Sequence, residues 1–238
     1  MILKRKIYKK LLEWKKECQG KKALLIEGAR RIGKSTICEE FGKSEYKSFL
    51  LIDFAKKDKE VEGYFEKYLN DLDTFFMLLQ THFGTKLTER NSLIIFDEVQ
   101  MFPQARAAIK YLVADGRYDY IETGSLISIR ENVKNIVIPS EERHINMYPL
   151  DFEEFAIALE EDLLVEYIKK CFEKREPLER SMHNQAMLLF HQYMLVGGMP
   201  MPVVTFIESK KDFTEADREK RDILKLYRED IMKIDAKY

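Results

Sequence analysis

The first 150 residues alternate short, unbroken apolar runs with longer segments whose apolar side chains recur every three or four positions. The short runs are predicted strands, at 23–27, 48–54, 93–96 and 119–122, with a fifth expected from 136–138 and 144–148. Such runs are typical of strands buried on both faces of a parallel sheet. The segments between them are predicted helices, at 34–41, 57–83 and 103–114. Strands that alternate with helices favour an α/β fold with a parallel sheet.

The pattern changes after Pro149. Asp151 and Glu154 have the spacing of a capping box, and helical spacing continues from there to the end of the sequence. Glycine and proline interrupt it only at Pro177 and at 197–202. The sequence therefore predicts two parts, an α/β core over 1–148 and an all-helical part over 149–238.

The N-terminal segment is an amphipathic and strongly basic helix by its pattern. Leu3, Ile7, Leu11 and Trp14 recur at helical spacing, and the helix is expected to end near Gly20. Residues 1–22 carry nine Lys and Arg against two Glu, a balance of +7, while the rest of the chain has a balance of −8. The lysines can form a solvated face, or they can contact nucleic acid, anionic lipid or the protein's own acidic surface.

Composition excludes several classes of protein. Of the 238 residues 45% are apolar, and the 15 Phe and 12 Tyr supply ample material for a core, which argues against disorder. No run of 18 apolar residues could span a membrane, and the N-terminus lacks the apolar core of a signal peptide. The three cysteines are widely spaced and form no C-x-x-C pair, so we expect a reducing, cytoplasmic setting.

A phosphate-binding loop follows the first predicted strand. Residues 28–35 match the pattern G-x-x-x-x-G-K-[ST] in full, with Gly28, Gly33, Lys34 and Ser35 at the defining positions. Glycines let the backbone wrap closely around a phosphate, and the N–H groups at the start of the next helix then face the anion. Lys34 is expected to reach the β- and γ-phosphates, and the Ser35 hydroxyl to bind Mg²⁺.

Two carboxylates follow the buried run at 93–96. Ligands of open α/β sheets lie at the carboxyl ends of the strands, so Asp97 is the expected Mg²⁺ partner and Glu98 is placed to activate a water. The N-K-x-D motif that reads guanine is absent, and small-molecule kinases often lack the second acid. The pair therefore favours ATP hydrolysis over GTP hydrolysis or phosphotransfer.

Further candidates come from the next strand end and from the arginines. Thr123 and Ser125 flank Gly124, where a small hydroxyl could sense the γ-phosphate. An arginine is expected to stabilise charge in the transition state. The sequence does not choose among six of them, Arg30, Arg31, Arg106, Arg117, Arg130 and Arg143. The four histidines show no ligand spacing and are expected to be structural.

Six motifs occur along the chain in the order GARRIGKST, LIIFDEVQ, ETGSL, MYPLDFEEF, YMLVGGMP and ILKLYREDI. The set resembles the N-terminal AAA-type ATPase portion (the AAA_14 domain) of bacterial and archaeal ATP-binding proteins that carry a DUF4143 C-terminal region. This resemblance implies a P-loop NTPase fold of the ASCE/AAA type, a parallel sheet flanked by helices and followed by a helical lid. Members are usually longer, so the chain is expected to be truncated before most of the C-terminal region.

The resemblance also implies residue roles. Gly28, Gly33, Lys34, Ser35 and Thr36 match Walker A, with Arg30 and Arg31 inside the same loop, and Asp97 and Glu98 match Walker B. Ser125, rather than Thr123, is favoured as the sensor of the γ-phosphate. Pro200 matches a lid proline that packs near adenine. The strand that carries the sensor is expected between the strands of Walker A and Walker B.

These observations predict a Mg²⁺-dependent ATPase of the AAA type that binds ATP or ADP and acts as a nucleotide-driven switch. Lys34, Glu98 and Ser125 are its expected catalytic residues, and Ser35 and Asp97 its metal ligands. A nucleotide-gated module with little turnover is the alternative. It would bind DNA or a protein client through the basic N-terminal helix or the C-terminal region. A P-loop phosphotransferase is a third reading.

Overall fold

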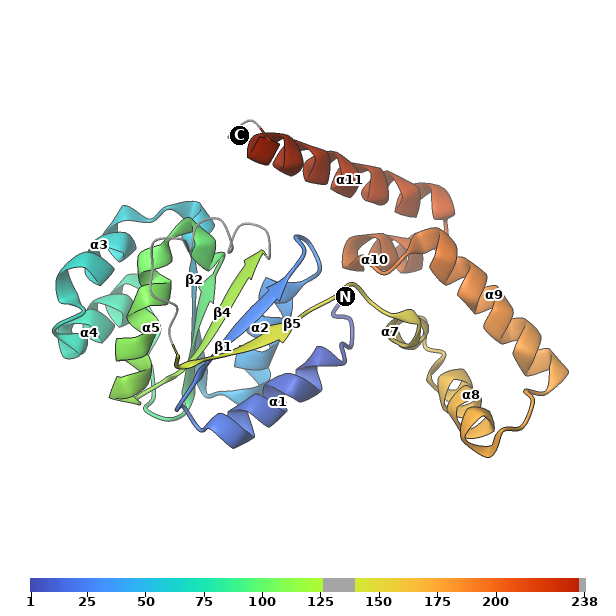
Figure 1. The fold of residues 1–238 in the computed structure, drawn as a ribbon, viewed down its shortest axis with the longest axis horizontal. Helices are drawn as coiled ribbons and strands as arrows, with labels where there is room; N and C mark the ends of the chain where they lie inside the picture. The colour runs from blue at the N-terminus through green and yellow to red at the C-terminus, as the bar shows by residue number, and fades with distance from the viewer. Residues whose placement is uncertain (126–139, 236–238) are drawn as a thin grey trace. The chain divides into compact units, whose positions relative to one another are not determined.

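The computed structural model describes residues 1–125 and 140–235, and the chain divides into two compact units (Figure 1). The first unit runs from Ile7 to Met147 and is called the core here. The second combines Met1–Lys6 with the chain from Tyr148 onward and is called the helical unit.

A five-stranded parallel sheet forms the centre of the core, as the sequence predicts. Its strands are β1 (Ala23–Gly28), β2 (Ser48–Asp53), β3 (Ser92–Asp97), β4 (Asp119–Ser125) and β5 (Glu142–Asn146). The order β2-β3-β4-β1-β5 places β4 between β1 and β3. All four strand pairings are parallel and helices flank the sheet, which is the α/β architecture that the sequence predicts.

The fifth strand differs from its predicted range. β5 begins at Glu142 and ends at Asn146, and the apolar run at 136–138 lies outside the described residues. A charged residue at the start of a strand argues against burial, yet the Glu142 side chain is fully buried because Arg106 neutralises it. The sequence pattern did not reveal this pairing.

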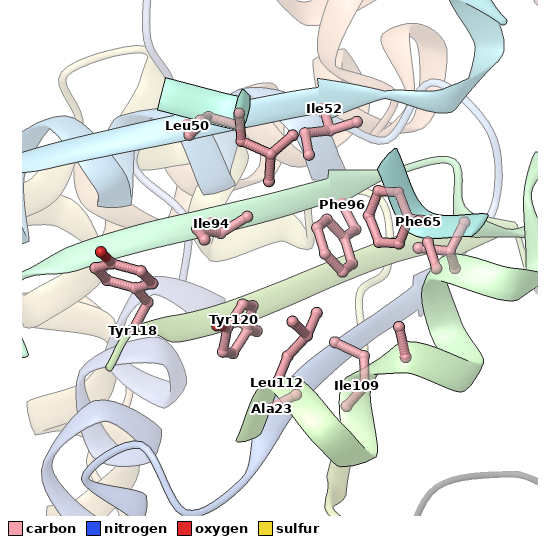
Figure 2. Close-up of a cluster of buried hydrophobic side chains, with 14 of the residues drawn as sticks. Ala23, Leu50, Ile52, Phe65, Ile94, Phe96, Ile109, Leu112, Tyr118 and Tyr120 are labelled. Carbon is pink, nitrogen blue, oxygen red and sulfur yellow. The ribbon is translucent and has the colours of Figure 1, made fainter. Parts of the chain in front are cut away.

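The main hydrophobic core lies on one face of the sheet (Figure 2). Alternate strand residues such as Ile94 and Phe96 pack there against α3 (Lys59–Tyr68), α4 (Leu72–Phe83) and α5 (Pro103–Asp115). The helix predicted over 57–83 is two helices, because the Asp71 side chain accepts a hydrogen bond from the Thr74 amide and starts α4 as its N-cap. Short 3-10 turns follow two of the strands, η1 (Phe54–Lys56) and η2 (Val99–Met101).

The opposite face is covered by α2 (Lys34–Glu45), against which α1 (Ile7–Cys18) packs. The predicted apolar stripe of α1 is buried, and Trp14 packs against Phe41 of α2. Leu3 does not continue this stripe, because it packs in the helical unit instead.

The helical unit contains α7 (Phe152–Ala158), α8 (Asp162–Lys174), α9 (Arg180–Val196), α10 (Pro200–Glu208) and α11 (Phe213–Asp235). The predicted capping box is present, since the Asp151 carboxylate accepts from the Glu154 amide and the Glu154 carboxylate from the Asp151 amide. Gly198 has no room for a side chain, because an added Cβ would lie 2.1 Å from the Leu150 carbonyl oxygen.

Part of the basic N-terminal segment is neutralised within the helical unit. The Arg5 guanidinium lies 3.2 Å from the Glu154 carboxylate, and both side chains are buried. The Lys6 ammonium lies 2.6 Å from Asp151 and 2.7 Å from Glu153. The sequence left open whether the basic residues contact nucleic acid, lipid or the protein's own acidic surface. For Arg5 and Lys6, the structure shows contacts with the protein's own acidic residues.

Candidate nucleotide site

The phosphate loop joins β1 to α2 over residues 29–33, and its backbone needs glycine at both ends. Gly33 has a φ of +90°, in the left-handed region that glycine adopts readily. At Gly28 an added Cβ would lie 2.4 Å from the Met147 carbonyl oxygen and 2.5 Å from Ile32 Cδ1. The start of the loop is therefore packed closely between Met147, the residue after β5, and the side chain of Ile32.

Lys34 is a buried cation at the start of α2. Its side chain is folded into the loop, where Nζ donates to the carbonyl oxygens of Gly28 at 3.1 Å and Ala29 at 2.8 Å. Burial lowers the pKa of the Lys34 ammonium, and the carboxylates of Glu98 and Asp97 oppose part of that shift. A positive charge is thus concentrated where the loop amides and the helix N-terminus already favour an anion.

Ser35 and Asp97 meet although they are 62 residues apart in the sequence. The Ser35 hydroxyl donates to Asp97 Oδ1 at 2.8 Å, and the Thr123 hydroxyl donates to the same oxygen. Ser35 and Asp97 supply oxygen ligands, the kind Mg²⁺ prefers, and this ion usually takes its remaining ligands from phosphates and water. Within residues 1–125 and 140–235 no cluster of three or more His, Cys, Asp or Glu is arranged to hold a metal by itself. The hydroxyl and carboxylate oxygens of Ser35 and Asp97 therefore fit a magnesium ion.

Glu98 lies at a sharp turn directly after β3. Its φ of +56° is left-handed, and its amide donates to the Thr123 hydroxyl at 3.3 Å. Gln100, in the 3-10 turn that follows, donates from Nε2 to the Glu98 carboxylate. The turn thus places a half-buried carboxylate next to Asp97 at the carboxyl edge of the sheet.

The predicted site residues lie on several different elements of the structure. Gly28, Gly33, Lys34, Ser35, Asp97 and Glu98 gather at the ends of β1 and β3. Ser125 is buried opposite Gly28 in the pairing of β4 with β1, whereas Thr123 is the residue of ETGSL that contacts Asp97. Thr36 is exposed on α2, and Pro200 is the first residue of α10 in the helical unit.

The six candidate arginines now fall into groups. Three are committed to ion pairs in the core, Arg106 with Glu142, Arg117 with Asp115, and Arg143 with Glu17. Arg130 lies outside the described residues. Arg30 and Arg31 are exposed on the phosphate loop, and the charge of Arg30 contributes to lowering the pKa of Lys34.

Sequence reasoning missed two contacts of the site. It did not assign Gln100 a role, although the residue belongs to the DEVQ motif and lies two positions after Glu98. It also ranked Thr123 below Ser125. Alternation along β4 could not separate the two, because Thr123 and Ser125 share a face of the strand. The register of β4 against β3, which places Thr123 beside the end of β3, is known only from the structure.

In the part of the chain that the structure describes, no helix is long and apolar enough to cross a membrane.

Comparison with known proteins gives one family match and several distant structures. Residues 20–156 match the family model AAA_14, described as an AAA domain. No curated protein matches the chain. One similar solved structure is the Orc1 protein of Aeropyrum pernix in complex with DNA, at 9% identity and a TM-score of 0.40, covering 82% of this chain and 68% of that one.

Two other solved structures are similarly distant. The STAND protein PH0952 from Pyrococcus horikoshii, which has a tetratricopeptide repeat sensor, is 17% identical with a TM-score of 0.41. The match covers 85% of this chain and 29% of the chain of PH0952. PCH-2 from C. elegans is 11% identical with a TM-score of 0.42, and the match covers 91% of this chain and 65% of the PCH-2 chain. Because the AAA domain model matches more than half of the sequence, the chain belongs to the AAA_14 family of nucleotide-binding, AAA-type ATPases.

Proposed function

We propose that the protein is a Mg²⁺-dependent ATP hydrolase that acts as a nucleotide-driven switch. The observation that carries the proposal is the hydrogen bond between Ser35 and Asp97, 2.8 Å long, beside the buried ammonium of Lys34. The adjacent lysine and hydroxyl of α2 meet there a carboxylate that lies 62 residues away from Ser35 in the sequence. Each has the chemistry that a nucleoside triphosphate and its magnesium ion require.

Each residue of the site has a separate role in the proposed reaction. Lys34 would exchange its two loop carbonyls for phosphate oxygens, which are stronger acceptors because they are charged. Ser35 and Asp97 would hold Mg²⁺, which offsets negative charge on the phosphates when bound. Glu98 would orient a water toward the γ-phosphate and take its proton as the water oxygen bonds to phosphorus and ADP leaves.

Other predicted residues have supporting parts in this proposal. Arg30 and Arg31 would contact the nucleotide from the loop, and Thr36 from the first turn of α2. Ser125 would respond to the γ-phosphate from the end of β4. Pro200 keeps the role toward adenine that the resemblance to lid prolines implies. Loss of the γ-phosphate would then change the state of the switch.

Two variants separate binding from turnover. Lys34→Ala removes the phosphate cation and should abolish nucleotide binding. Glu98→Gln keeps the shape but accepts no proton, so it should bind ATP and lose about 10²–10⁴-fold in hydrolysis rate. Nucleotide at about 100 times its Kd should raise the unfolding free energy of wild type and Glu98→Gln by about 2.7 kcal/mol.

Lys43→Ala is the matched control on the same helix. This lysine is exposed and pairs with Glu39, so its removal should leave both binding and turnover unchanged. If Glu98→Gln hydrolyses ATP as fast as wild type, Glu98 is not the base. If wild type shows no stabilisation by ATP or ADP with Mg²⁺, the proposed function is wrong.

A second candidate function is a nucleotide-gated module that binds nucleic acid, and the lysines of α1 and the turn after it favour it. Lys9, Lys10, Lys16, Lys21 and Lys22 are exposed, and none forms an ion pair within residues 1–125 and 140–235. Exposed cations without acidic partners are the electrostatic feature that binds a phosphate backbone. Replacing the five with Gln should then weaken DNA binding and flatten its salt dependence, and an unchanged affinity would reject this candidate.

A further inference from the structure

Thr123 is the residue that links both acids of the candidate site. Its hydroxyl donates to Asp97 Oδ1 and accepts the amide hydrogen of Glu98 at 3.3 Å. A hydroxyl has one hydrogen to donate, so these two bonds specify its direction completely. The chain of bonds continues from Asp97 Oδ1 to the Ser35 hydroxyl and thereby joins β4, β3 and α2.

The position of Thr123 in the sheet explains why a side chain is needed there. Pairing between β3 and β4 ends with Phe96 opposite Glu122, and Thr123 is the next residue along β4. Beyond this point the chain turns away at Glu98, whose backbone is left-handed with a φ of +56°. The Thr123 hydroxyl replaces the backbone hydrogen bonds that the ladder no longer supplies.

Burial and stiffness suit Thr123 to this task. The side chain has no exposed surface, so water does not compete for its hydrogen bonds. Threonine is branched at Cβ and therefore has few accessible χ1 rotamers in a strand. The hydroxyl is thus held in one place, and its two partners are held with it.

We infer that Thr123 is a positioning residue, whose hydroxyl orients the Asp97 carboxylate toward the magnesium ion and fixes the turn that presents Glu98. This inference rests on the proposed function, and it differs from the expectation that a hydroxyl of ETGSL senses the γ-phosphate through a hydrogen bond to the attacking water. Neighbours that orient a metal-binding carboxylate commonly affect metal affinity or activity by about 10–100-fold.

The test compares three variants with wild type. Thr123→Val keeps the shape and loses the hydroxyl, while Thr123→Ser keeps the hydroxyl. Ser92→Ala is the matched control, because Ser92 is a fully buried hydroxyl at the other end of β3, bonded to Ser48 Oγ at 2.7 Å. The first readout is the Kd of a fluorescent ADP with Mg²⁺ and with EDTA, whose ratio isolates the contribution of the ion. The second is kcat and KM for ATP.

Thr123→Val should lose about tenfold or more of the Mg²⁺-dependent gain in affinity and at least as much kcat. Its affinity in EDTA should stay within about threefold of wild type, because Lys34 and the loop are untouched. Thr123→Ser and Ser92→Ala should retain both the gain and kcat. If Thr123→Val does not fold, Thr123→Ala also removes the hydroxyl, and the same losses are expected of it.

Two results would overturn the inference. One is a hydroxyl-free variant that keeps both the Mg²⁺-dependent gain and kcat. The other is a Thr123→Ser variant as impaired as Thr123→Val, which would assign the effect to packing. Failure of the proposed function is a separate outcome, because wild type itself would then show no Mg²⁺-dependent nucleotide binding.

Discussion

Arg106 offers the sharpest test of how the core is held together. Its guanidinium forms two hydrogen bonds to the Glu142 carboxylate, Nε to Oε1 at 3.0 Å and Nη2 to Oε2 at 2.7 Å. The Arg106 side chain is 2% exposed and that of Glu142 is 0% exposed. The pair joins α5 to β5, the edge strand of the sheet next to β1.

Arg106→Met should destabilise the core by about 3–5 kcal/mol, because it leaves the Glu142 charge buried without its partner. Glu122 cannot compensate, because it is itself an acid and supplies no positive charge; burial beside Glu142 raises its pKa well above the usual range. At about 2–4 °C per kcal/mol, the midpoint of thermal unfolding should fall by about 6–20 °C. The double variant Arg106→Met with Glu142→Met should recover most of the loss, because neither charge remains to be desolvated.

Urea unfolding is the suitable assay, followed by the fluorescence of Trp14, the single tryptophan, which is buried in the core. All variants are compared at the same pH, and His144 is left unchanged in each because its Nε2 lies 3.1 Å from the Glu142 carboxylate. Arg143→Met is the control, because its pair with Glu17 is exposed and should contribute about 1 kcal/mol or less. A cost below about 1 kcal/mol for Arg106→Met, or a double variant as unstable as the single one, would refute the reasoning.

Two further predictions concern Glu122 and the phosphate loop. Because burial, reinforced by the neighbouring Glu142, raises the pKa of Glu122 in the folded state, the native protein holds a proton that the unfolded chain releases above about pH 4.5. The free energy of unfolding should therefore fall by up to about 1.4 kcal/mol per pH unit as the pH rises from 4.5 toward the folded pKa of Glu122. Glu122→Gln should remove this slope when unfolding in urea is measured at several pH values. A slope unchanged by the substitution would contradict the prediction. Gly28→Ala should lose stabilisation by ADP in a thermal shift assay and lower the midpoint, because the new Cβ would lie 2.4 Å from the Met147 oxygen. Gly63→Ala in α3 is the control, because nothing lies within 4 Å of a Cβ added there, and it should leave stability unchanged or raise it by up to about 1 kcal/mol. Equal behaviour of the two glycine variants would be inconsistent with the proposed clash at Gly28.

Much of the core could be predicted from sequence because its signals are local. Buried parallel strands require unbroken apolar runs, and the runs at 23–27 and 93–96 lie in β1 and β3. The phosphate loop can be predicted from Gly28, Gly33 and Lys34. Glycine allows the backbone to wrap closely around a phosphate, and lysine supplies the positive charge that binds it. The capping box at Asp151 is local too, because its two partners are three residues apart.

Errors appear where a charged or polar residue makes a contact that the apolar pattern does not show. The buried Glu142 hides the start of β5, because its partner Arg106 lies 36 residues earlier on α5. The helix predicted over 57–83 missed its interruption, because the apolar spacing continues across the cap at Asp71. The basic N-terminal segment is a single pattern in the sequence, yet Arg5 and Lys6 belong to the helical unit and Lys9 to the core.

The sequence by itself determined the α/β class, the phosphate loop and the identity of the acids Asp97 and Glu98. These depend on short-range spacing and on the conformational freedom of glycine, both of which are properties of a local segment. Only the tertiary structure decided that Thr123, rather than Ser125, contacts Asp97. It also decided that three of the six candidate arginines, Arg106, Arg117 and Arg143, form ion pairs in the core. These outcomes depend on strand order and on hydrogen bonds between residues far apart in the sequence, which no local pattern encodes.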